Sequence, residues 1–152
     1  MPIHILTVGK KHESWVSEGI QRYQKRLKSP FIPEWVLMAH SSLDGLSARE
    51  DESGRILSKL DAYDFIILLD ERGKSLDSPA LANVLQERLD RSQKVLIIIG
   101  GAFGVTDELR NRAHLVWSLS PLVFPHQLVR LILTEQLYRS QQINTGGSYH
   151  HE

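Results

Sequence analysis

Two short, uninterrupted apolar runs, FIILL at 65–69 and VLIII at 95–99, constrain the fold of this 152-residue chain most strongly. A strand with one solvated face alternates apolar and polar residues, whereas a strand covered on both faces is apolar throughout. Both runs are the longest of their kind here and far shorter than a membrane span. We therefore expect two central parallel strands that are buried between layers of helices.

Strand and helix patterns alternate along the rest of the chain. Further strands are expected at 3–8, 34–40 and 114–119, and residues 41–48 are rich in turn formers. Helices are expected at 14–27 with Ser14 as N-cap, at 49–60, from Ser78-Pro79, briefly from Thr106-Asp107, and from about 125 to 142. This order predicts an α/β fold with a mainly parallel sheet flanked by helices, in a single domain over residues 1–152.

Composition excludes several classes of function. Lys plus Arg and Asp plus Glu both number 18, so the chain is not one that grips nucleic acid by bulk positive charge. The absence of cysteine removes disulfides, thiolate zinc sites and cysteine nucleophiles, and it fits a cytoplasmic protein. No two of the seven histidines have the spacing of a zinc site, and no signal peptide or membrane span is visible. We expect neither a metal nor a membrane partner.

Three segments follow expected strands, where parallel sheets bind ligands: LLDERGKS at 68–75, IIIGGAFG at 97–104 and WSLSPLVFPHQLVR at 117–130. A phosphate-binding P-loop would need glycine where Leu68 stands. A dinucleotide fingerprint would need glycines where Ala102 and Val105 stand. Taken singly, the first segment is most often a plain turn, the second could be a tight strand-to-helix turn, and the third could be core packing unless it encloses a ligand.

The last expected helix carries His126, Arg130 and Arg139. His126 and Arg130 are four residues apart and share a face, whereas Arg139, 13 residues after His126, projects from another side. One helix cannot bring all three to a point. Glu135 and Arg139 could form a surface ion pair.

A basic cluster that lies mostly in the first expected helix could be a solvated face or could contact RNA. Its members are Arg22, Lys25, Arg26 and Lys28.

The three loops, followed in order by EQLYRSQQI and a terminal YHHE, resemble the SPOUT class of RNA methyltransferases over the whole chain. The resemblance is closest to the small RlmH type, which methylates N3 of a pseudouridine in large-subunit ribosomal RNA. It implies a C-terminal trefoil knot, which is an exception to the rule that chains are not knotted. It also implies S-adenosylmethionine bound in a bent shape and a homodimer in which one subunit's tail completes the partner's site.

The resemblance also implies the site residues. Matching cofactor positions are Leu69, Gly101 and a run in the third loop: Ser120, Pro121, Leu122, Val123, Phe124 and Pro125. Matching catalytic positions are His126, Arg139, Tyr149 and His150. His126, Tyr149 and His150 remain equal candidates for the base, and Arg139 would hold a phosphate or the developing base anion. The RlmH type commonly has Arg where this chain has His151. Because an imidazole lacks the paired N–H donors of a guanidinium, the resemblance does not imply a phosphate contact at position 151.

Two other functions remain open from the sequence. A ribosome-binding assembly factor would keep the cofactor fold without turnover, and a generic nucleotide-binding α/β protein would explain the glycine loops alone. The neutral net charge fits recognition of an assembled ribosome better than a grip on free RNA by many phosphates.

Overall fold

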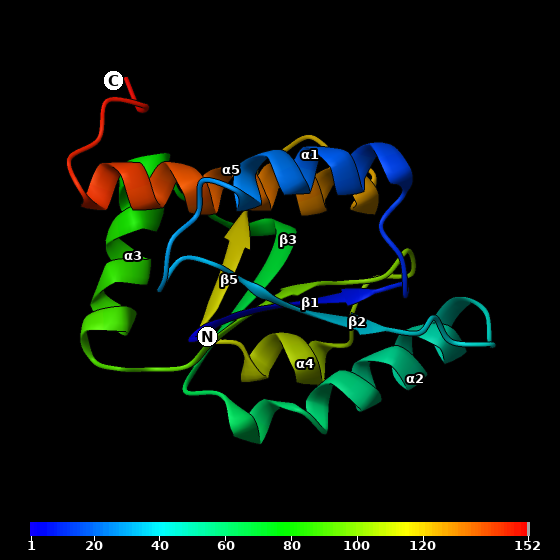
Figure 1. The fold of residues 1–152 in the computed structure, drawn as a ribbon. Helices are drawn as coiled ribbons and strands as arrows, with labels where there is room; N and C mark the ends of the chain where they lie inside the picture. Colours follow the sequence, from blue (N-terminus) through cyan, green and yellow to red (C-terminus); the bar gives the residue numbers. More distant parts are fainter. Residues whose placement is uncertain (152) are drawn as a thin grey trace.

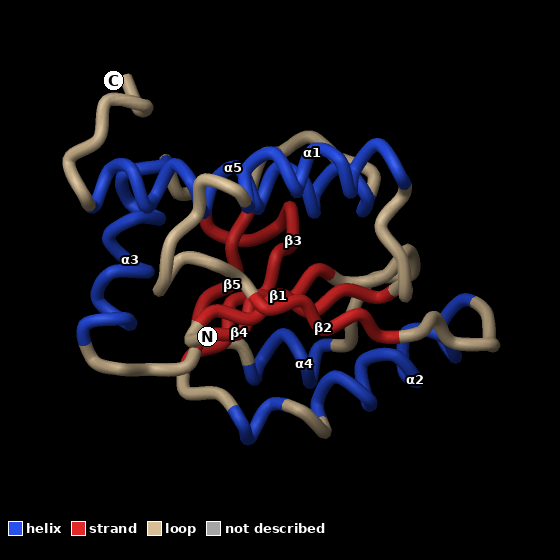
Figure 2. The backbone as a smooth tube through the Cα atoms, viewed as in Figure 1, coloured by secondary structure: helices blue, strands red, loops and turns tan. Residues whose placement is uncertain are grey.

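Five parallel strands form one sheet in the computed structural model, which describes residues 1–151 (Figures 1 and 2). The order across the sheet is β2-β1-β4-β3-β5. The strands are β1 (Ile3–Val8), β2 (Glu34–Met38), β3 (Phe65–Ser75), β4 (Val95–Ile99) and β5 (Leu115–Ser118). The helices are α1 (Ser14–Gln24), α2 (Gly45–Leu57), α3 (Ser78–Asp90), α4 (Asp107–Arg112) and α5 (His126–Asn144), with a short 3-10 turn at Leu60–Ala62.

The helices cover both faces of the sheet. In Figure 1, α1, α3 and α5 lie on one side, where α5 packs against both of the others, and α2 and α4 lie together on the opposite side. Within the described residues 1–151, no helix is both long and apolar enough to cross a membrane.

Strand β4 at the centre of the sheet shows why its sequence is apolar throughout. Val95, Ile97 and Ile99 contribute to the core beneath α1, α3 and α5, while Leu96 and Ile98 contribute to the core beneath α2 and α4. All five residues are buried. Because successive side chains point to opposite faces and both faces of β4 are covered, every residue of this strand packs in an apolar core. The expected buried parallel strands are confirmed.

Helix boundaries differ from the expected ones: α2 ends at Leu57 and not at 60, α5 continues to Asn144, and the start of α2 and the end of α1 also move. Helix α2 begins at Gly45, not at 49, because the side chain of Asp44 accepts a hydrogen bond from the Gly45 amide and caps the helix within the expected turn region. Helix α1 ends at Gln24, short of the expected 27, and its N-cap is Glu13, with Ser14 as the first helical residue.

Strand β3 is longer than expected and continues past the apolar run to Ser75. Its register against β5 shifts between Leu69 and Lys74, after which Lys74 pairs with Trp117. A Cβ atom at Gly73 would lie 2.6 Å from the carbonyl oxygen of Val116, so the close approach of the two strands requires glycine. The LLDERGKS segment is therefore a bulged strand and not a plain turn.

Candidate functional site

The carboxyl ends of β3, β4 and β5 open into a cavity of about 550 Å³. The structure brings seven of the expected site residues to its lining: Leu69, Gly101, Ser120, Leu122, Val123, Phe124 and His126. Pro121 and Pro125 lie outside the lining, in the loop that carries its third wall. The cavity is thus built by the three strand-end segments that the sequence singled out.

The glycine segment after β4 forms a tight turn at the cavity wall. The Gly104 amide donates to the Gly101 carbonyl oxygen at 3.1 Å, and Gly104 has a φ of +76°. At Gly101, a Cβ atom would lie 2.5 Å from Oε1 of Glu52 and 3.3 Å from Cγ1 of Val8. A side chain at Gly101 is therefore excluded by residues packed behind the wall.

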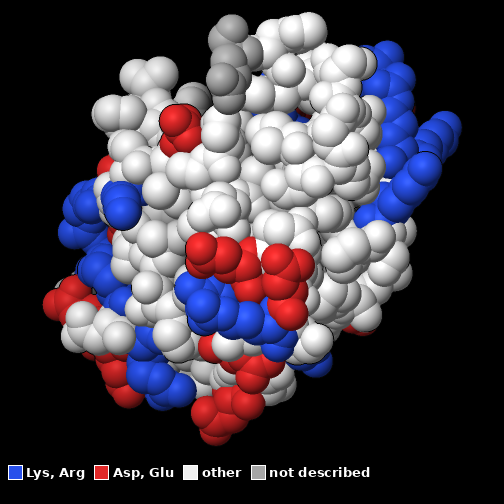
Figure 3. All heavy atoms as spheres, turned by 90° about the vertical axis from the view of Figure 1, so that its left-hand side faces the viewer, with Lys and Arg blue, Asp and Glu red and all other residues white. Residues whose placement is uncertain are grey.

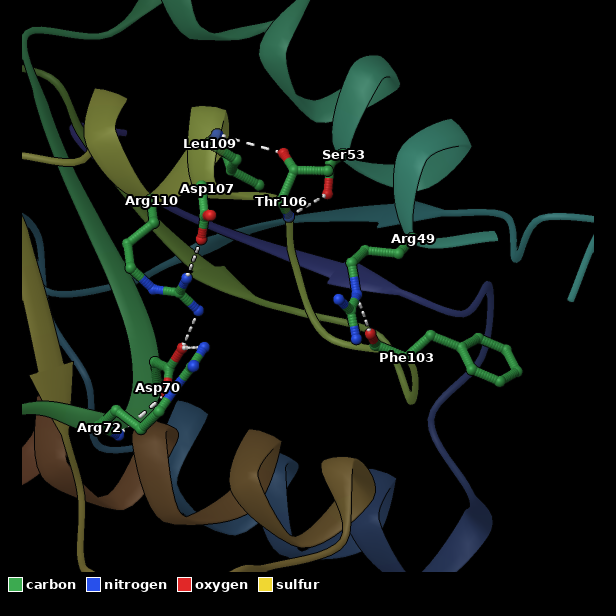
Figure 4. Close-up of polar contacts among 9 residues, drawn as sticks. All are labelled: Arg49, Ser53, Asp70, Arg72, Phe103, Thr106, Asp107, Leu109 and Arg110. Atoms are coloured by element: carbon green, nitrogen blue, oxygen red, sulfur yellow. Dashed lines mark hydrogen bonds and ion pairs between the residues drawn. The ribbon is translucent and has the colours of Figure 1, made fainter. Parts of the chain in front are cut away.

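Helix α2 holds this glycine segment in place (Figure 4). Arg49 donates from Nε to the Phe103 carbonyl oxygen at 2.6 Å, and one turn later the Ser53 hydroxyl accepts from the Thr106 amide at 3.0 Å. Thr106 in turn caps α4 through a bond from the Leu109 amide. Sequence reasoning missed this contribution, because the partners are more than 50 positions apart.

Glu52, on the same helix, is a buried carboxylate with only 4% of its surface exposed. Its Oε2 accepts from the Ser41 amide at 3.0 Å, whereas Oε1 has no hydrogen-bond partner within residues 1–151. This side chain is therefore packed directly behind Gly101, which lines the cavity.

A charged network ties the end of β3 to α4 on the other side of the cavity (Figure 4). Asp70 accepts from the Arg72 amide at 2.9 Å and from Arg110 at 2.6 Å, and Arg110 also pairs with Asp107 at 3.0 Å. Burial opposes ionisation of Asp70, but the hydrogen bonds from Arg72 and Arg110 outweigh it and lower its pKa to about 2. Arg72 and Arg110, which line the cavity, are therefore already neutralised by carboxylates.

His126 is the first residue of α5 and lines the cavity. Partial enclosure by the surrounding loops, followed by the positive charge of Arg130, lowers its pKa below the ordinary 6.5. The imidazole is therefore neutral at physiological pH and has a free lone pair for a proton.

Arg130, one turn along, has a different role from His126 although the two were expected to share a face. Its side chain is 1% exposed and donates to the Lys11 carbonyl oxygen at 2.8 Å and to those of Val8 and Gly9 at 3.3 Å each. Burial lowers its pKa. Arg130 thus fixes the loop after β1 from within the protein.

The other expected catalytic residues form a second cluster at the far end of α5, outside the cavity lining. Arg139 donates to Glu135 at 2.8 Å, contacts Nδ1 of His150 at 3.0 Å, and lies over the Tyr149 ring, 4.7 Å from its centroid. The Tyr149 hydroxyl donates to Glu135 at 3.4 Å. Glu135 and Arg139 are therefore the centre of an ordered cluster and not a simple surface ion pair.

Tyr149 is fully protonated in this cluster. Partial burial, then a hydrogen bond with Tyr23 and the negative charge of Glu135, raise its pKa to about 12. Its hydroxyl can donate a hydrogen bond at neutral pH but is a poor proton acceptor. Within residues 1–151, no group of three or more His, Cys, Asp or Glu side chains is placed to hold a metal ion.

Sequence comparison finds relatives over the full chain. The family model described as "Predicted SPOUT methyltransferase" matches residues 1–150. A protein of Geobacter sp. named "Ribosomal RNA large subunit methyltransferase H" is 39% identical over 155 residues, and the match covers all of both chains. Proteins with the same name from Desulfitobacterium hafniense and Thioalkalivibrio sulfidiphilus are 38% and 35% identical, over 99% and 100% of each chain.

Solved structures share the fold at low sequence identity. A probable methylase family protein from Haemophilus influenzae superposes with a TM-score of 0.61 and 13% identity, covering 99% of this chain and 71% of the other. TrmJ from Z. mobilis gives a TM-score of 0.54 and 12% identity, covering 93% and 70%. At this level of identity, the likeness shows a shared fold alone.

Proposed function

The chain belongs to the SPOUT methyltransferase family, and from this premise we propose that it transfers a methyl group from S-adenosylmethionine to large-subunit ribosomal RNA. The finer assignment, to N3 of a pseudouridine in the assembled ribosome, follows from the resemblance to the RlmH type. The observation that carries the proposal is the cavity formed jointly by the three strand-end loops.

The residues around this cavity fit the proposed cofactor. A volume of about 550 Å³ is typical of small-molecule sites. The glycine segment offers bare backbone to a flat ligand, since Gly101 carries no side chain and cannot accept one. Leu69, Leu122 and Phe124 provide apolar walls. Bound there, S-adenosylmethionine supplies a methyl group that is already activated on a sulfonium.

The chain's own residues must then orient the acceptor and remove its proton. Positioning supplies much of the rate when the donor is already activated. His126 is neutral and lines the cavity, so it can accept the proton that leaves the acceptor nitrogen. Tyr149, with its raised pKa, is suited to donate a hydrogen bond, and Arg139 to stabilise negative charge on the base or to hold a phosphate.

A complete site requires two subunits in this proposal. His126 begins α5, whereas Arg139, Tyr149 and His150 cluster around its other end, about 20 Å away along the helix axis. The cluster of one subunit would meet the cavity of its partner in a homodimer. In Figure 3, charged side chains are sparse over the upper part of the face that carries the C-terminal segment. This surface supports contact with a second copy of the chain. Depletion of charge is typical of the cores of interfaces.

Two further properties belong to the same proposal. A C-terminal trefoil knot is supported by the convergence of all three strand-end loops on one cavity, from which α5 departs. A cytoplasmic location is supported by the ribosomal substrate.

The direct test is transfer of labelled methyl from S-adenosylmethionine to ribosomes from a strain that lacks this protein, followed by mass spectrometry of the RNA. A single added methyl on a pseudouridine is the expected result. Binding to ribosomes without transfer would instead indicate a non-catalytic assembly factor. Binding of a nucleotide in preference to S-adenosylmethionine would indicate a different use of the cavity.

A further inference from the structure

Phe103 is a partly exposed aromatic residue in the glycine segment. Its neighbours Ala102 and Gly104 line the cavity, while Phe103 itself is 38% exposed. Figure 4 shows its ring pointing away from the network around Asp70 and Arg110. Part of the ring is therefore open to solvent beside the cavity, where a flat ligand could pack on it.

The backbone beneath this ring is held rigidly. The Gly104 amide bonds to Gly101 across the turn, Arg49 binds the Phe103 carbonyl oxygen at 2.6 Å, and the Thr106 amide is bound by Ser53. Phe103 is therefore presented from a fixed platform, so little conformational entropy is lost when a ligand stacks on it.

Arg49 adds an available positive charge beside the ring. Only its Nε is engaged, and its two terminal nitrogens have no hydrogen-bond or ion-pair partner within residues 1–151. The other arginines that line the cavity, Arg72 and Arg110, are paired with Asp70 and Asp107. Arg49 is thus the lining arginine, in the described part of the chain, that remains free to bind an anion.

We propose that Arg49 and Phe103 form a docking corner for one nucleotide of the RNA substrate at the rim of the methyl-transfer cavity. The base stacks on the Phe103 ring while the terminal nitrogens of Arg49 bind the adjacent phosphate. Unpaired bases of single-stranded RNA are commonly bound by this combination of an aromatic face and a cation. The inference rests on the proposed function and adds to it two residues that contact the substrate.

Other occupants fit the two residues less well. A second copy of the chain could cover Phe103, but it would bury the free guanidinium of Arg49 at a cost in desolvation unless it also supplied an anion. The carboxylate of S-adenosylmethionine could pair with Arg49 but would leave the outward ring of Phe103 in water. RNA supplies a flat apolar face and a negative charge next to each other.

Three variants test the docking corner: Phe103→Ala, Phe103→Trp and Arg49→Gln. Arg55→Gln is the matched control, because Arg55 lies on the same helix, pairs with Asp51 and is outside the cavity lining. For each variant, KM for ribosomes and kcat are measured at several salt concentrations. The affinity for S-adenosylmethionine is measured by calorimetry and the oligomeric state by light scattering.

We expect Phe103→Ala to raise KM for ribosomes roughly tenfold, with unchanged affinity for S-adenosylmethionine, and Phe103→Trp to remain near wild type. Arg49→Gln should raise KM for ribosomes. It should also reduce the slope of log KM against log salt concentration by about one, the value for one phosphate contact, while Arg55→Gln should change neither quantity. An unchanged KM in Phe103→Ala overturns the inference, as does a loss of S-adenosylmethionine affinity alone or dissociation to monomers. Failure of the wild-type protein to transfer methyl would refute the proposed function instead.

Discussion

His126 and Arg139 belong to one unbroken helix, yet they lie 13 residues apart and take part in two separate sites. His126 lines the cavity, whereas Arg139 is bound to Glu135 and His150. A straight helix fixes this separation at about 20 Å, so no side-chain rotation can close it. The composite site therefore follows from the geometry of α5 if both residues act in one reaction.

Replacement of Arg139 should separate methyl transfer from cofactor binding. Arg139→Ala removes the charge at the centre of the second cluster but touches nothing in the cavity lining. We expect methyl transfer to fall at least 100-fold, the loss typical of a removed charge-stabilising group. Affinity for S-adenosylmethionine, measured by calorimetry, should stay within about twofold. Arg112→Ala, an exposed arginine paired with Asp61, serves as the control. Equal loss of cofactor affinity would contradict the role assigned to Arg139.

Substitution of Gly101 should act on cofactor binding. In Gly101→Ala the new methyl would meet Oε1 of Glu52 at 2.5 Å, and Glu52 is buried and held by Ser41, so the loop must move. Calorimetry should then show a drop of tenfold or more in affinity for S-adenosylmethionine. Gly54→Ala on α2, where a Cβ would meet no atom within 4 Å, is the matched control and should leave binding unchanged.

The double variant Gly101→Ala/Glu52→Ala checks the cause of that loss. Because the shorter side chain removes the clash, part of the affinity should return. If it does not, the effect of Gly101→Ala comes from contact with the ligand and not from Glu52.

The Asp70 carboxylate should stabilise the fold in a pH-dependent way. Its pKa is about 2 in the folded protein against an ordinary value of 3.8, so the stabilisation is present above about pH 4 and is lost as the pH falls towards 2. Urea unfolding of Asp70→Asn at pH 7 should show a loss on the order of 1–2 kcal/mol. The difference from wild type should shrink as the pH is lowered from 4 to 2. A difference that stays constant over this range would exclude ionisation of Asp70 as its source.

Removal of the buried Arg130 should destabilise the protein strongly. Arg130→Ala removes the Arg130 donor from the carbonyl oxygens of Val8 and Gly9, leaves Lys11 with the Gln127 amide as its side-chain donor, and also creates a cavity. We expect a loss of about 3 kcal/mol or more, which corresponds to a Tm lower by roughly 6–12 °C in a chain of this size. Arg130→Lys should recover only part of the loss, because an ammonium cannot reproduce the guanidinium fork. A Tm within 2 °C or so of wild type in Arg130→Ala would show that the loop after β1 is held by other contacts.

The strands could be predicted well because their signal is local. The expected limits of β4 agree with the structure to the residue, since two-sided burial is recorded directly in its run of apolar side chains. The limits of β1 agree as well, although the buried His4 and Thr7 interrupt its apolar residues. The start of α2 could not be located as well. Residues 41–48 contain several turn formers, and only the structure identifies Asp44 among them as the N-cap.

The position of the cavity could be predicted from the sequence, but the residues that hold its wall in place could not. Parallel strand ends meet at one edge, so the three segments that follow the expected strands indicated the site. The residues that hold the glycine segment lie in REDES, a charged run from Arg49 to Ser53. Nothing in this run distinguishes the buried Glu52 and Ser53 from the exposed Glu50 and Asp51, because their burial depends on contacts with distant segments. The same holds for Arg130, whose hydrogen bonds cross more than 115 positions.

A mixed dimer tests the composite site most directly. Two differently tagged chains, one with Gly101→Ala and the other with Arg139→Ala, are expressed together, and the species carrying both tags is purified. At an S-adenosylmethionine concentration well below the Kd of the Gly101→Ala variant, each homodimer should show little methyl transfer. In the mixed dimer, the intact cavity of the Arg139→Ala subunit meets the intact cluster of the Gly101→Ala subunit, so about half of the wild-type activity per dimer should appear. If each subunit used its own cavity and its own cluster, every site would carry a defect, and the mixed dimer would be as inactive as the two homodimers.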